Sequence, residues 1–119
     1  MTVISPDVTL RPLDLAELGA ELLADAGQRP AGRAATTLTP GGGGLKQVVM
    51  ALVAGHVLQD HRAPGAATLQ LLAGSVRLTW GGSSQIVRSG EWVAIPDAVH
   101  GVTAIEDAIA LLTVGLDGR

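Results

Sequence analysis

Three histidines are the first candidates for chemistry in this sequence: His56, His61 and His100. A neutral imidazole binds divalent metals, and its charge changes close to neutral pH. The chain has no cysteine, which excludes disulfides, thiolate ligands and a cysteine nucleophile. The G-x-S-x-G pattern of a serine nucleophile elbow is absent, and so is the Gly-Lys-Ser/Thr end of a phosphate-binding loop.

The elements that position these histidines are predicted to be short strands. From residue 33 onward, short apolar or alternating runs are separated by turn residues such as Pro-Gly, Gly-Gly and Ser-Gly. About nine such runs with no second helix predict an all-β sandwich or barrel. One helix is predicted over residues 14–27, where Asp14 can cap the start and Gly27 can close the end. Gly74 stands alone between two strand-like runs and suits a tight turn at positive φ.

Composition favours a single globular domain. Of the 119 residues, 47% are apolar and 16% charged, which is typical of a folded rather than a disordered chain. The net charge of −3, with scattered basic residues, argues against a nucleic-acid partner. We see no signal peptide at the N-terminus, and the longest aliphatic run, residues 48–54, is too short to span a bilayer. We therefore expect a soluble, cytoplasmic protein without a membrane partner.

One stretch combines a histidine with regularly placed glycines. Gly55 leads a strand that reaches His61, a Pro-Gly turn follows, and the next strand ends at Gly74. This spacing resembles the first motif of the cupin family, which runs glycine, five residues, His-x-His, three or four residues, Glu, six residues and glycine. On this resemblance Ala63 occupies the place of the second histidine, and Ala67 that of the glutamate.

The second cupin motif also has a counterpart. In the family it runs glycine, five residues, Pro-x-Gly, two residues, His, three residues and Asn. Here Gly90 and Pro96 keep the spacing, Ala98 replaces the second glycine, and His100 comes one residue early. The resemblance covers roughly residues 33–115.

The resemblance implies an all-β fold, a small cupin-type double-stranded β-helix (jelly-roll barrel) with one N-terminal α-helix. We expect residues 1–32 to form an arm and a helix packed on the barrel, and residues 33–119 to form the barrel itself. Small cupins are commonly homodimers. Two runs that are apolar on both faces, 48–54 and 108–114, suit burial between two layers or two subunits, so we expect a homodimer.

In typical cupins three histidines and one glutamate hold a divalent metal, and only His61 and His100 stand at matching places. Two imidazoles alone make a weak site, because catalytic metal sites usually have three protein ligands. His56 lies five residues before His61, an odd offset that puts the two side chains on opposite faces of a regular strand. A shared metal would need a bulge or bend there. We therefore expect a divalent ion (iron, nickel, manganese or zinc) to be weakly bound or absent, and His56 to be exposed or at a strand end.

The alanines at the other two motif positions have two interpretations. They remove a metal site and let their neighbours collapse, or they leave a cavity for an apolar or partly polar ligand. By alternation Ala67, Leu69 and Leu71 share the side that faces the barrel. Trp92 is the aromatic residue expected near such a pocket, with core or interface packing as its ordinary alternative. The candidate ligand-pocket residues are His61, His100, Ala63, Ala67, Leu69 and Trp92.

Three functions stay open at this point. The first is a binding module that holds a small, mostly apolar molecule in the barrel, with His61 and His100 as polar anchors. The second is a metal-dependent enzyme of the dioxygenase or isomerase type, in which the same two histidines are metal ligands. The third is a structural protein without a ligand. The missing histidine and glutamate favour the first, since metal chemistry needs those residues most.

Overall fold

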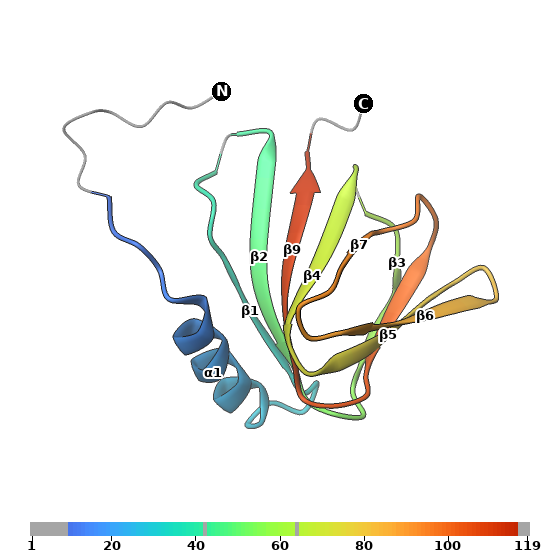
Figure 1. Ribbon diagram of the computed structural model, residues 1–119, viewed down its shortest axis with the longest axis horizontal. Coiled ribbons are helices and arrows are strands. Elements are labelled where there is room, and N and C mark those ends of the chain that lie inside the picture. The colour runs from blue at the N-terminus through green and yellow to red at the C-terminus, as the bar shows by residue number, and fades with distance from the viewer. Residues whose placement is uncertain (1–9, 42, 64, 117–119) are drawn as a thin grey trace.

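The structure, a computed structural model, describes residues 10–41, 43–63 and 65–116. Within these ranges it has one helix and nine strands, as the sequence predicts (Figure 1). The elements in chain order are α1 (Leu15–Ala26), β1 (Arg33–Thr37), β2 (Leu45–Leu52), β3 (Val57–His61), β4 (Ala67–Ala73), β5 (Ser75–Trp80), β6 (Ser83–Arg88), β7 (Trp92–Ala94), β8 (His100–Ala104) and β9 (Ala108–Gly115). No helix among the described residues is long and apolar enough to cross a membrane.

The strands form two antiparallel sheets that face each other. The first sheet has the order β1-β2-β9-β4-β7, and the second has the order β3-β8-β5-β6. The predicted all-β jelly-roll architecture is therefore confirmed. The sheets are not joined into a closed barrel within the described chain. They lie close together at one end and spread apart toward the other (Figure 1).

The connections between the sheets explain this shape. At the narrow end the chain crosses between the sheets in short links of four, one, three and three residues: 53–56, 74, 89–91 and 105–107. At the wide end the crossovers are the five-residue segments 62–66 and 95–99. His61 ends β3 and His100 begins β8, so both histidines lie at the wide end of the molecule.

The core fills the space between the sheets with aliphatic side chains. Its buried members are Leu52, Leu69, Leu71, Val76, Leu78, Val87, Val102, Ala104, Ala108 and Ala110. With no Phe or Tyr in the chain, these residues supply most of the hydrophobic stabilisation. Further apolar side chains pack against this core and are only partly buried: Leu58, Trp80, Val93, Ile95 and Leu112.

Helix α1 covers the outer side of the first sheet. Asp14 caps it as predicted, its carboxylate accepting a hydrogen bond of 3.1 Å from the Glu17 N–H. Ala26 of the helix is buried against Ala34 of β1 and Ala51 of β2. Gly19 allows a close approach to β9, since a Cβ there would lie 2.7 Å from Ile109 Cγ2.

The one-residue link at Gly74 is the tightest of the crossovers. Gly74 adopts the predicted positive φ, +80°. A Cβ at this position would overlap the backbone carbonyl of Asp107, in the neighbouring crossover. Position 74 therefore requires glycine for two reasons: its positive φ and the lack of space for a side chain.

Gly74→Ala is expected to destabilise the fold more than Gly90→Ala. Both glycines have positive φ, +80° and +87°, so both alanines carry a backbone cost of about 1–2 kcal/mol. A Cβ at Gly90 meets no atom within 4 Å, whereas the overlap at Gly74 adds about 1–3 kcal/mol. Urea unfolding of the two variants gives the comparison, and equal losses of unfolding free energy would contradict this packing.

Candidate ligand-binding site

A register shift in β3 brings the two motif histidines together. Strands β3 and β8 pair regularly at Leu58 and Val102, but the register then shifts, and His61 lies opposite His100. An unbroken ladder would have placed Asp60 opposite His100. The extra residue makes a β-bulge, which turns His61 rather than Asp60 toward the partner strand's histidine.

The bulge also decides which face the pair occupies. His100 and Val102 share a face of β8, because side chains two residues apart point the same way. Val102 is buried in the core, so this is the inner face. His100 is only 5% exposed, while His61 lies at the exposed rim. Their ring centroids are 4.5 Å apart, and the ring planes are tilted by 55°.

Each imidazole is held by a backbone carbonyl. The Nδ1 atom of His61 lies 2.9 Å from the Gln59 oxygen, and that of His100 lies 3.1 Å from the Ala98 oxygen. A carbonyl oxygen only accepts hydrogen bonds, so each Nδ1 carries a hydrogen and donates it. In a neutral ring this fixes the tautomer and leaves the Nε2 lone pair for a ligand.

A tryptophan extends this pair into a row across three strands. Trp80 of β5 pairs with His100 of β8. Val76 and Leu78 of β5 are core residues, so alternation places Trp80 on the same inner face, where it packs, partly buried, against the core. The aromatic surface beside the histidines therefore belongs to Trp80. The alternation of residues 76, 78 and 80 was the sequence signal that could have found it.

Trp92, the tryptophan expected in the pocket, lies outside the space between the sheets. It pairs with Gln70, and residues directly opposite in a ladder share a face. Gln70 is exposed, on the side of β4 opposite to Leu69 and Leu71. The Trp92 side chain is 59% exposed. The structure thus corrects the assignment of Trp92 to the pocket, because the strand's register turns it outward.

The other predicted pocket residues differ in how deeply they are buried. Leu69 and Leu71 are buried within the core, on the face that alternation predicts. Ala67, at the start of β4, is partly buried, and so is Ala63 in the segment after β3. Small side chains therefore lie near the wide end, and larger ones fill the space between the sheets toward the narrow end.

His56 belongs to a different part of the molecule. It lies in the link between β2 and β3, and its ring packs on Gly32, where a Cβ would collide with it. Its backbone carbonyl accepts a hydrogen bond of 3.0 Å from the Ala104 N–H. The position just before β3 matches the predicted strand-end role.

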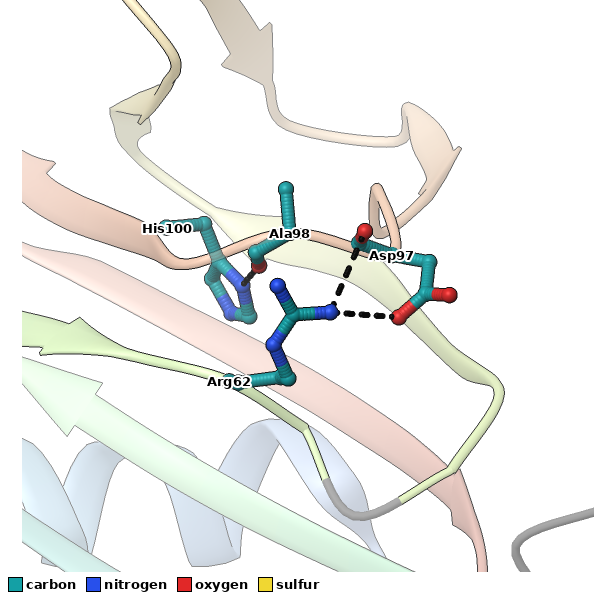
Figure 2. A network of polar contacts seen from close by, with 4 residues as sticks. All are labelled: Arg62, Asp97, Ala98 and His100. Carbon is teal, nitrogen blue, oxygen red and sulfur yellow. Dashed lines mark hydrogen bonds and ion pairs between the residues drawn. The ribbon is translucent and has the colours of Figure 1, made fainter.

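An ion pair joins the two crossover segments beside the histidines. Arg62 Nη1 lies 2.9 Å from Asp97 Oδ1 and also donates to the Asp97 carbonyl at 3.4 Å. Figure 2 shows the Arg62 guanidinium reaching Asp97, with the His100 ring bonded to Ala98 beside it. The side chains are 56% and 98% exposed, so the pair stabilises the fold by less than about 1 kcal/mol.

Comparison with solved structures identifies the fold. The chain is similar to a conserved protein of unknown function from Streptococcus pyogenes, with 23% identity over 97% of this chain and 95% of that one, at a TM-score of 0.70. It is also similar to a cupin superfamily protein from Desulfitobacterium hafniense, with 12% identity, coverage of 71% and 78%, and a TM-score of 0.67. The chain has the cupin fold. No protein-family model and no curated protein sequence matches it.

A third similar structure is an enzyme. The chain is similar to a salicylate 1,2-dioxygenase from Pseudaminobacter salicylatoxidans, with 16% identity and a TM-score of 0.71. The match covers 83% of this chain but 33% of the dioxygenase. Similarity at this level establishes the fold and leaves the reaction open, since one fold carries many activities.

The described residues offer few ligands for a metal ion. Within the described ranges, no group of three or more His, Asp or Glu side chains could hold a metal ion. His61 and His100 supply two nitrogen donors, while alanines stand at the other two motif positions. Catalytic metal sites usually have three protein ligands, so the residues present supply only part of a typical coordination shell.

Proposed function

We propose that this cupin binds a small molecule between its two sheets, with His61 and His100 as the polar anchors. The observation that carries the proposal is the geometry of the pair. The rings lie side by side at 4.5 Å, and each is oriented by a bond from Nδ1 to a backbone carbonyl. A polar group of the ligand would then meet two adjacent Nε2 atoms.

The partly buried side chains around the core suit an apolar ligand body. Several apolar residues pack against the core and remain partly exposed: Leu58, Trp80, Val93, Ile95 and Leu112. Covering them with a ligand removes apolar surface from water, at roughly 25 cal/mol per Å². Ligand pockets commonly combine such a wall with a few convergent polar groups.

The histidines set the polar chemistry of the ligand. Neutral imidazoles with free Nε2 atoms accept hydrogen bonds, for example from a hydroxyl group. A protonated imidazole donates instead, and so suits an oxygen acceptor. Trp80 adds a flat surface on which a planar ligand can stack. We expect a molecule with an apolar, planar body and one oxygen-bearing polar end.

Benzyl alcohol is a suitable probe, because it combines an aromatic ring with one hydroxyl. In ¹H–¹⁵N NMR titrations it should shift the amides of residues 58–61 and 100–102. His61→Ala and His100→Ala should each weaken binding about tenfold, the loss of one hydrogen bond of roughly 1–1.5 kcal/mol. The spectra of the variants also report whether they remain folded.

His56→Ala is the matched control, because it removes a histidine that lies outside the pair. Its affinity for benzyl alcohol should equal that of the unaltered chain. Equal affinity in all three variants, or shifts confined to other regions, would contradict the proposed pocket.

The metal-dependent enzyme is the second candidate. One observation favours it: metal-binding histidines almost always donate their other ring N–H to a carbonyl, carboxylate or water, as both histidines do here. One similar structure is also a dioxygenase by name. In such an enzyme, water or the substrate would complete the coordination shell of a metal bound by His61 and His100.

Elemental analysis separates the two candidates. The protein is purified without chelators or metal-affinity resin, and iron, nickel, manganese and zinc are measured. We expect less than one equivalent of any metal, because two imidazoles make a weak site. A stoichiometric metal that is lost in His61→Ala and His100→Ala but kept in His56→Ala would replace the first candidate with the second.

A further inference from the structure

Arg33, on the opposite sheet, lines the same surface depression as His61. It begins β1, the edge strand of the first sheet, and lies opposite Leu52. Leu52 is a core residue, so Arg33 starts on the inner face. Its side chain lines a depression of about 300 Å³ together with Leu58, Gln59, Asp60 and His61. The depression thus joins the edges of the two sheets, β1 and β3, and includes His61, the exposed member of the histidine pair.

The charge of Arg33 is not used by an ion pair within the described part of the chain. The two ion pairs found there are Arg29 with Asp25 and Arg62 with Asp97. Asp60 is the acid of the depression, but the bulge turns its carboxylate over Gly101. Gly101 and Asp60 also adjoin Thr79, on the outer face of the second sheet. Arg33 and His61 therefore line one depression, and among the described residues Arg33 belongs to neither ion pair.

We propose that the ligand of this cupin carries a carboxylate, bound by Arg33 with the help of His61. The inference rests on the proposed function, since it assigns the charge of the molecule that the histidine pair anchors. A guanidinium offers two parallel N–H donors that match the two oxygens of a carboxylate. A second donor comes from His61 when its ring is protonated.

The net charge of the site favours a single negative charge on the ligand. Arg33 contributes one positive charge, Arg62 is neutralised by Asp97, and the Asp60 carboxylate lies over Gly101, on the outer face of the second sheet. A doubly charged phosphate would bring more negative charge than these groups balance. A monocarboxylate with an apolar ring or chain has a charge that matches Arg33. Its apolar part suits the partly buried apolar side chains that pack against the core.

Benzoate and benzyl alcohol test this assignment. Both contain an aromatic ring, but benzoate ends in a charged carboxylate and benzyl alcohol in a neutral hydroxyl. NMR titration of the full chain should show benzoate binding about tenfold or more tighter, as charge-assisted hydrogen bonds are the stronger ones. Arg33→Gln should reduce benzoate affinity to the level of benzyl alcohol and leave benzyl alcohol unchanged. Added salt should weaken benzoate binding only.

Arg77→Gln is the matched control. Arg77 is exposed on the outer face of the second sheet, where it contacts Ser84, so its loss changes the net charge equally without touching the depression. Benzoate binding should be unaffected in this variant.

The outcomes separate the two proposals. If both probes bind with equal affinity and Arg33→Gln changes neither, the carboxylate assignment is overturned while the binding site stands. If benzyl alcohol binds and benzoate does not, the assignment is also overturned. If neither probe binds at the histidine pair, the proposed function fails, and the carboxylate assignment fails with it.

Discussion

One extra residue in β3 decides which side chain meets His100. Without the bulge between Leu58 and His61, the ladder to β8 would turn Asp60 inward and His61 outward. The inner face would then carry a carboxylate beside a buried imidazole, and the pair of histidines would not exist. The approach of His61 to His100 and the position of Asp60 over Gly101 both depend on this shift. The pairing of His100 with Trp80 lies in the neighbouring ladder and does not.

The buried member of the pair illustrates how the fold keeps a polar ring on an apolar face. His100 is almost fully buried, and a polar group in such a place is costly unless it is hydrogen-bonded. Its Nδ1–H donates to the carbonyl of Ala98, in the crossover that leads into β8. The same bond directs Nε2 away from the backbone. One contact therefore satisfies the ring and prepares it for a ligand.

Much of the fold follows from sequence pattern alone. The helix was predicted over residues 14–27 and spans Leu15–Ala26, and the number of strands agrees. Gly74 could be predicted because a one-residue link between strands needs a positive φ. The cupin spacing also marked His61 and His100, which the structure places opposite each other. The homodimer stays a prediction.

The remaining features depend on register, which composition and alternation do not reveal. The bulge leaves no distinct signature in the sequence "VLQDH", so the face of His61 could be set only by its pairing. Trp92 was misplaced because β7 has three residues, too few for alternation to define a face. The depression that Arg33 and His61 share joins the edges of two sheets, and such arrangements of distant segments come from the tertiary fold.

A nuclear Overhauser measurement on the histidine rings tests the central claim most directly. With ring centroids 4.5 Å apart, the folded protein should show cross-peaks between ring protons of His61 and His100. Backbone cross-peaks should pair His61, rather than Asp60, with His100. A folded protein that lacks the ring cross-peaks and pairs Asp60 with His100 would have the unbulged register, and the proposed site would not form.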